Sequence, residues 1–204
     1  VVQCFIKDYK SAIQSYQHAL QIRLKLFGEN HADTAQSYEN IGNAQYEMKD
    51  YKSASQSDKQ ALHIRLKLFG ENHGDTAKSY HNIGRTQHDM TDYKSAVQSH
   101  QRALEIRLKL FGENHADTAQ SYHSIGVTHH TMQDYKSSLQ SHQQALQIRL
   151  KLFGENHADT AQSYHSIGVT HRTMQDYKSS LQSHQQALQI RLKLFGENHA
   201  DTAQ

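Results

Sequence analysis

Apolar and polar positions follow one another along the chain with the spacing of amphipathic helices. In one stretch, Ala119, Tyr122 and Ile125 lie three residues apart and define one face of a first helix, predicted over 118–132. After a polar break, apolar residues return at mostly helical spacing and predict a second helix over 135–153. Two helices separated by short turns are therefore the unit from which the chain is built.

Residues that favour helix ends flank the second helix. Asp134 offers a carboxylate oxygen to the free amides of its first turn, and Gly154 can adopt the left-handed conformation that closes a helix without a Cβ clash. The matching residues in the other copies are Asp8, Asp50, Asp92 and Asp176 before the helix, and Gly28, Gly70, Gly112 and Gly196 after it. Each first helix also holds a glycine, as at Gly126. Because glycine inside a helix costs up to about 1 kcal/mol relative to alanine, its recurrence predicts a close approach between helices.

The pattern repeats with a strict step of 42 residues, which predicts a single array of stacked, like units. Residues 112–153 and 154–195 match at 41 of 42 positions and differ only where His130 is replaced by Arg172. The predicted boundaries are a partial repeat at 1–31, with the end of a first helix and a whole second helix, then full repeats at 32–73, 74–115, 116–157 and 158–199, and the start of another at 200–204. Because both ends would expose helix-packing surface, we expect the array to continue in a longer protein, or its ends to self-associate.

Composition favours an extended array over a compact enzyme core. Only 36% of the 204 residues are apolar and the mean hydropathy is −0.85, as expected when units bury only the sides that face their neighbours. The net charge of +2 comes without a long basic block, which argues against nucleic acid as a partner. No apolar run approaches the roughly 18 residues that span a bilayer, so no membrane partner is expected. The single cysteine, Cys4, favours a reducing, cytoplasmic location.

One set of offsets within the unit carries a family resemblance. In the second full repeat it comprises Tyr80, Ile83, Gly84, Ala96 and Ala103. This pattern resembles the tetratricopeptide repeat, and the 42-residue length resembles the kinesin light chain and nephrocystin variety of that family. The resemblance implies an all-α fold, a right-handed α-solenoid of stacked antiparallel helix pairs. It also implies that a protein or an extended peptide binds in a concave groove lined by the first helices.

Two departures from that family's pattern affect the expected packing. Proline is absent, so the first helices lack a residue preorganised for their first turn, and we expect softer turns. Positions that are aromatic in the family are polar in this chain, such as His129 in a first helix and Asp58 and His142 in second helices. Asp58 at a packing position predicts local looseness or partial exposure.

The resemblance places one face of each first helix in the groove. The residues expected to contact a partner there are Asn40, Asn43, Tyr46, Lys78, His81, Asn82, Arg85, His88, His123, His130, His165 and Arg172. Their amides, imidazoles and cations suit hydrogen bonding to an extended peptide, and Lys78 with Arg85 would hold an acidic side chain. For any single residue, a merely solvated helix face is the competing interpretation. The Arg149 and Lys151 pair, which recurs on second helices, is interpreted as a solvated outer face.

Seventeen histidines raise the question of a metal site. His123 and His130 lie about 10 Å apart along one helix, too far to share a metal ion. His129 is predicted to face His142 across a helix pair, with the same arrangement in the next copy, but two imidazoles without a third ligand make a poor zinc site. We therefore expect no metal and no other cofactor. Buried imidazoles would make the array acid-labile.

The repeats also bear on the class of function. Serine, histidine and aspartate recur identically in each unit and none is singular, so we expect no enzymatic activity. The favoured function is a scaffold that binds a protein or extended peptide. The alternative is the sensor or regulatory repeat region of a larger multidomain receptor or nucleotide-dependent switch, which a P-loop upstream in the parent protein would favour. A third interpretation is that the copies are recent duplicates without a selected ligand.

Overall fold

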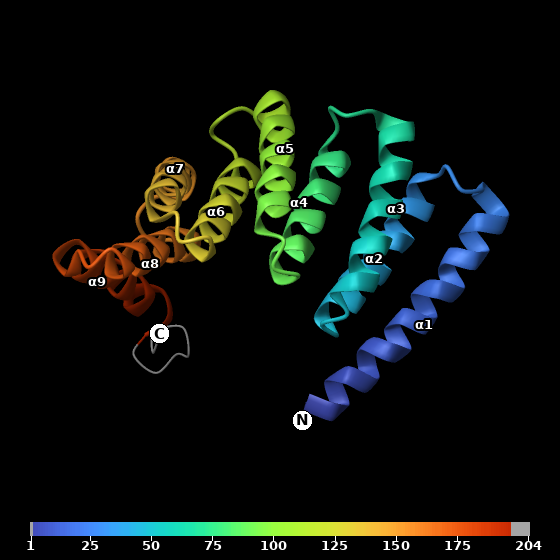
Figure 1. Ribbon diagram of the computed structural model, residues 1–204, viewed down its shortest axis with the longest axis horizontal. Coiled ribbons are helices and arrows are strands. Elements are labelled where there is room, and N and C mark those ends of the chain that lie inside the picture. Colours follow the sequence, from blue (N-terminus) through green and yellow to red (C-terminus); the bar gives the residue numbers. More distant parts are fainter. Residues whose placement is uncertain (1, 197–204) are drawn as a thin grey trace. The chain divides into compact units, whose positions relative to one another are not determined.

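The computed structural model describes residues 2–196, with side chains from Asp8 onward, and it contains helices, turns and loops in this range (Figure 1). The helices are α1 (Val2–Phe27), α2 (Ala32–Glu47), α3 (Tyr51–Phe69), α4 (Gly74–Asp89), α5 (Tyr93–Phe111), α6 (Ala116–Thr131), α7 (Tyr135–Phe153), α8 (Ala158–Thr173) and α9 (Tyr177–Phe195). Among these residues, no helix is both long and apolar enough to cross a membrane. The predicted start of a further repeat at 200–204 lies outside the described residues.

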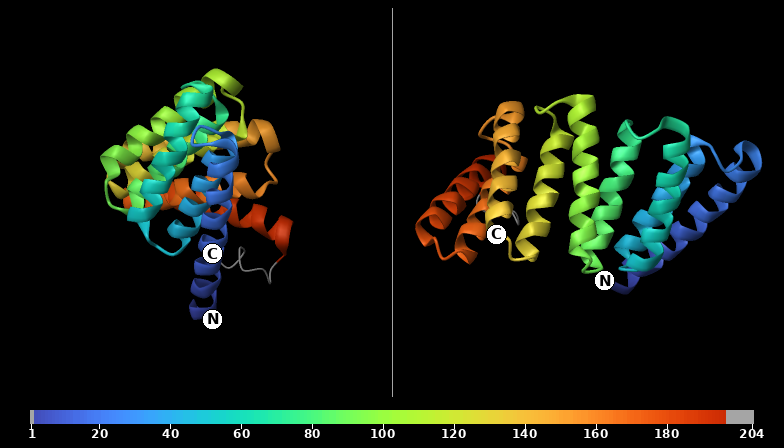
Figure 2. Two further views of the ribbon diagram at one scale, coloured as in Figure 1. Left: turned by 90° about the vertical axis from the view of Figure 1, so that its right-hand side faces the viewer. Right: turned by 45° about the horizontal axis from the view of Figure 1, so that its top comes forward.

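Helix contacts divide the chain into two units, residues 1–110 and 111–204. In the first unit, α1 packs on α2, α2 on α3 and α3 on α4, and the rings of His81 (α4) and His100 (α5) lie 5.3 Å apart. In the second unit, α6, α7, α8 and α9 pack in the same consecutive order. Figure 2 shows the two helices of each pair side by side and running in opposite directions. The predicted all-α fold of stacked antiparallel helix pairs is confirmed within each unit.

The second helices begin at aspartate caps. Asp50 and Asp134 accept hydrogen bonds from the backbone amides of Ser53 and Ser137 at 3.2 Å, as predicted. Asp8 instead lies inside α1, which runs unbroken through the turn predicted at that position. In the other copies this turn folds the second helix back against a first helix.

A histidine cap, which the sequence did not predict, precedes each first helix that the structure describes, one residue before the position where the family has proline. Nδ1 of His115 accepts a hydrogen bond from the amide of Asp117 at 3.1 Å, and the His115 ring stacks on Phe111 with centroids 4.3 Å apart. Thr118 Oγ1 donates to the carbonyl of Gly112 at 3.0 Å. The same interactions recur in the three other described copies. The repeated Phe-Gly-Glu-Asn-His string therefore closes one helix and starts the next.

The glycine that ends each second helix takes a conformation that other residues avoid. Gly154 has a φ of 77°, the positive value predicted, but its ψ of −173° is extended and not left-handed helical. This combination is open to essentially only glycine. The prediction for Gly154 is therefore correct in φ and wrong in ψ. The backbone is extended at this residue because the chain must leave α7 in that direction to reach the cap of α8.

Small residues form the core between helices. Ala35, Ala54 and Ala61 are at most 1% exposed, and the matching residues of the other full repeats, each alanine or serine, are at most 5% exposed. A Cβ atom at Gly126 would lie only 2.7 Å from ring atoms of His142. The close helix approach predicted from the recurring glycine is therefore confirmed.

Arginines of three second helices link successive helix pairs within the two units. Arg149 is 2% exposed, so the solvated outer face predicted for it is wrong. Its Nη1 donates to Ser163 Oγ at 2.8 Å and to the Asp159 carbonyl at 3.0 Å. Arg65 and Arg23 also donate to a serine of the next first helix. The arginines of this stripe thus make repeat-to-repeat contacts inside each unit.

Candidate partner-binding surface

The predicted groove residues lie on α2 and α4 in the first unit and on α6 and α8 in the second. Most of them are partly exposed. Asn82 is an exception, with 7% of its surface exposed. Asn40 accepts a hydrogen bond from Gln36 at 3.0 Å, and Nδ1 of His88 lies 3.2 Å from Asp89 Oδ1. The remaining groove residues make different contacts in the two units.

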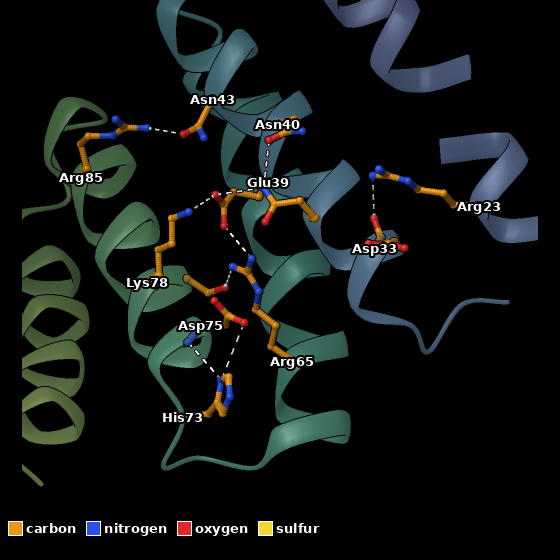
Figure 3. Close-up of polar contacts among 12 residues, drawn as sticks. Arg23, Asp33, Glu39, Asn40, Asn43, Arg65, His73, Asp75, Lys78 and Arg85 are labelled. Carbon is orange, nitrogen blue, oxygen red and sulfur yellow. Dashed lines mark hydrogen bonds and ion pairs between the residues drawn. The ribbon is translucent and has the colours of Figure 1, made fainter. Parts of the chain in front are cut away.

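In the first unit, the carboxylate that Lys78 contacts belongs to the chain itself. Lys78 Nζ lies 2.5 Å from Glu39 Oε1, and Arg65 Nη2 lies 2.7 Å from Glu39 Oε2 (Figure 3). Glu39 is 2% exposed. Burial alone would raise the pKa of Glu39, but the hydrogen bond from Lys78 and the positive charge of Arg65 outweigh burial and lower it. An acidic partner would have to compete with this internal carboxylate for Lys78.

Arg85, the second cation predicted to hold an acidic ligand, is also engaged within the chain. Its guanidinium stacks over the ring of Tyr46 at 3.8 Å from the ring centroid, and Nη2 donates to Asn43 Oδ1 at 2.9 Å. The Tyr46 hydroxyl donates to Asp89, and burial together with this hydrogen bond raises the pKa of Tyr46. The groove-facing ends of α2 and α4 are thus joined by Arg85.

Asp58 is tightly buried beneath these helices, so the predicted looseness is wrong. The residue is 2% exposed, and Thr86 Oγ1 donates to its carboxylate at 3.3 Å. A Cβ atom at Gly42 would lie 2.8 Å from Asp58 Oδ1. Burial raises the pKa of Asp58 to about 6, although the positive charge of Arg85 opposes the shift. Nearby cations make this buried carboxylate tolerable at a packing position.

In the second unit, an open pocket lies where the first unit has Arg85. Its volume is about 200 Å³. The lining residues come from three helices and are Val127, His130, Thr131, His142, His165, Ser166, Val169 and Thr170. By the 42-residue step, Val127 and Val169 occupy the positions of Asn43 and Arg85, and Val127 is 37% exposed. Replacement of the long cation by valine leaves a mildly apolar hollow on the groove face of α6 and α8.

The histidine pairs differ from the predicted ones. His142 packs against His123, with ring centroids 5.3 Å apart, and the expected His129 partner lies beside Asp134 instead, at 3.6 Å. The His142 ring lies against Gly126. His123 precedes this glycine by about one helical turn, and its ring therefore contacts His142, whereas the His129 ring lies beside Asp134. In the next copy, the ring partners are His165 and His184, at 5.2 Å, and His171 contacts Asp176 at 3.2 Å. Among the side chains that the structure describes, residues 8–196, no three metal-ligating groups converge on a point that could hold an ion.

A second, cationic pocket shares a wall with the apolar one. Its volume is about 450 Å³, and it is lined by His165, Val169, Arg172, His184, Ala187, Leu188 and Arg191. Burial lowers the pKa of His165 and His184, and the positive charges of Arg172 and Arg191 lower both further. No acidic residue lines this pocket among the described residues. The second unit therefore places an apolar hollow beside a positively charged one.

Three structural neighbours share the fold. A structure of BtubC (BKLC) from P. vanneervenii is 22% identical over 93% of this chain and 75% of its own, with a TM-score of 0.84. A putative kinesin light chain of Podosopora anserina, with nearly identical TPR-like repeats, is 15% identical over 95% of this chain and 92% of its own, with a TM-score of 0.79. A Rap protein complexed with Competence and Sporulation Factor is 19% identical over 92% of this chain and 50% of its own, with a TM-score of 0.74.

Sequence comparison assigns the family. No curated protein sequence matches the chain. The family model described as the tetratricopeptide repeat matches residues 2–67, 56–109, 92–151 and 117–193. These overlapping segments together span residues 2–193, nearly the whole chain. The chain belongs to the tetratricopeptide repeat family, whose fold is generally a non-catalytic scaffold for protein–protein interaction.

Proposed function

We propose that this chain is an interaction scaffold that binds an extended peptide segment of a partner protein along α6 and α8 of its second unit. An apolar side chain of the peptide enters the pocket between Val127 and Val169, and an acidic group beside it contacts Arg172. The observation that carries the proposal is the contrast between the copies, because the equivalent position in the first unit is covered by Arg85. The Rap protein of the same fold, solved with Competence and Sporulation Factor, is consistent with this mode of binding.

The chemistry of the pocket favours an apolar anchor over a charged one. Burial lowers the pKa of His142 to about 3, and burial together with the charge of Arg172 lowers the pKa of His130. Both imidazoles are therefore neutral at pH 7. Burial of one apolar side chain of medium size contributes about 1.5–3 kcal/mol, which is the range of an interface anchor residue.

The test is to select peptides that bind the chain and then to fill the pocket with a larger side chain. A random 12-residue peptide display library is selected on the intact chain, and an enriched peptide is synthesised with a fluorophore for anisotropy titration. Val169→Phe fills the pocket without adding charge, and we expect it to weaken binding at least roughly 30-fold, while Val169→Ala keeps the pocket open and changes binding little. Leu152→Phe, at a 39% exposed site on α7, is the matched control. Equal affinity for the Val169→Phe and control variants would contradict the proposal.

A second pair of variants tests the acidic part of the ligand. Arg172→Gln removes the charge beside the pocket, and Lys78→Gln removes the cation already paired with Glu39. We expect enriched peptides to contain an acidic residue near the anchor and to lose affinity with Arg172→Gln only. Enrichment of uncharged peptides with unchanged affinity for this variant would remove Arg172 from the site and leave the apolar anchor in place.

A further inference from the structure

Two buried positions carry a different pair of residues in the first full repeat than in the others. In the three later repeats both are histidine, and the two rings pack on each other at 5.2–5.3 Å. In the first full repeat the same positions hold two acids, Glu39 and Asp58, both 2% exposed. The exchange of two imidazoles for two carboxylates is therefore a paired change.

The repeat that follows carries two matching basic residues. At one position, where the other full repeats have glutamine, the second full repeat has Lys78. At another, where they have asparagine or valine, it has Arg85. Lys78 Nζ lies 2.5 Å from Glu39, across the contact between α2 and α4. Arg85 lies over Tyr46 of α2, where its positive charge acts on Asp58. Figure 3 shows the side chains of Lys78 and Arg85 reaching from α4 toward α2.

The remaining cation at this contact does not distinguish the repeats. Arg65 contacts Glu39 at 2.7 Å, but its counterpart Arg149 is present where the acids are replaced by histidine. In that setting Arg149 relies on Ser163, the Asp159 carbonyl and Gln120. The pair of acids and the pair of bases are thus a matched exchange of opposite charges between these two repeats.

We propose that Glu39, Asp58, Lys78 and Arg85 form a charge key that selects which repeat stacks on the first full repeat. The face made by α2 and α3 fits a first helix that carries lysine and arginine at these two offsets, and it rejects the otherwise similar α6 and α8. Those helices would place Gln120 or Gln162 and a valine opposite the two carboxylates, and a buried charge that loses its partner is strongly destabilising. Near-identical repeats can exchange neighbours within or between chains at little cost, and such pairing errors are typical of repeat proteins. The charge key would thus make the contact between the first and second full repeats specific to those two repeats.

The first test replaces the two acids alone, the two bases alone, and then all four residues together, in the intact chain. Glu39→His with Asp58→His gives the first repeat the histidine pair, and Lys78→Gln with Arg85→Val gives the second repeat the uncharged residues. We expect either half alone to lower the melting temperature by roughly 5–10 °C, and the four changes together to restore most of that loss. Additive losses in the fourfold variant overturn the proposal. If the half variants do not fold, a folded fourfold variant gives the same support, and a fourfold variant that also fails to fold overturns it.

The second test transplants the key to the second unit. His123→Glu with His142→Asp supplies the acids in α6 and α7, and Gln162→Lys with Val169→Arg supplies the bases in α8. Each half is expected to lower the melting temperature, and the two halves together to recover most of it, because α6 and α8 contact one another as α2 and α4 do. A transplanted chain no more stable than the sum of its halves shows that the four residues do not act as a transferable unit, and it overturns the proposal.

Discussion

At the scale of single residues, the array depends on contacts that tolerate little change in size. The glycine inside each first helix lies directly against a side chain of the paired second helix, which is Asp58 in one copy and a histidine in the other three. Alanine would be the better helix former at such a position by about 1 kcal/mol. Glycine is present because the helices approach closely, and packing therefore outweighs helix propensity.

This balance predicts the outcome of Gly126→Ala. The added Cβ would lie 2.7 Å from atoms of the His142 ring, which is 2% exposed, so the ring or the helix must shift. We expect a net loss of about 1–3 kcal/mol in the free energy of unfolding, measured by urea denaturation. Combining Gly126→Ala with His142→Ser removes the clashing ring, and the two changes should couple favourably. Gly126→Ala with unchanged or increased stability would show that the helices can separate freely.

At the scale of helices, the ends of each element follow from short strings of sequence. Aspartate caps, terminal glycines and the helical spacing of apolar residues were all readable from the chain, because each acts on neighbouring backbone within one turn. The Phe–His cap was not predicted, since stacking of His157 on Phe153 depends on the path of the intervening loop. The exact ψ of Gly154 was missed for the same reason.

The Phe–His cap predicts a difference between two substitutions of His157. Nδ1 of this residue accepts the amide of Asp159 at 3.1 Å, and its ring stacks on Phe153 at 4.3 Å. His157→Ala removes both and should cost about 1 kcal/mol or more. His157→Asn keeps a cap acceptor and loses only the stacking, so it should recover most of that cost. Hydrogen exchange at the first amides of α8 is the readout, and equal protection in both variants would contradict a capping role.

Contacts between elements were harder to predict than the elements themselves. Helical spacing placed His129 and His142 on facing helices, but which ring reaches His142 depends on the height at which the helices cross, and that ring is His123. Lys78 and Arg85 were predicted to hold an acidic ligand, and in the structure the acids they balance lie in a neighbouring helix pair of the chain itself. The substitution of Arg85 by Val169 was visible in the 42-residue alignment and was the available signal for the pocket in the second unit.

At the scale of the whole molecule, stability is shared among many similar interfaces. An array of this kind is held together by contacts between neighbouring helix pairs, and its interior is made of alanine, isoleucine, threonine, serine and buried charged groups, with no large aromatic among the buried residues that the structure describes. Burial without a charged partner lowers the pKa of a histidine. Because the histidine pair recurs while the acid pair occurs once, the response to acid differs between copies.

The last prediction concerns pH. Burial lowers the pKa of His100 and His123 to about 4 and that of His142 to about 3. The groups that act on His142 are His123, His130 and Arg149, none of them acidic, so a proton gained there is not compensated.

Since the unfolded chain binds these protons near pH 6.5, the histidines contribute full stability above that pH, and the contribution is lost as pH falls toward 4. The loss at pH 5.5 is on the order of 1 kcal/mol for each buried imidazole. Asp58 acts in the opposite sense, because its pKa is raised to about 6 and the folded state takes up a proton there as pH falls. We expect a melting midpoint several degrees lower at pH 5.5 than at pH 7.5, and a smaller shift when His123 and His142 are both replaced by asparagine. Equal midpoints at the two pH values would show that these imidazoles do not control acid stability, whereas a shift retained in the asparagine variant would assign it to other groups.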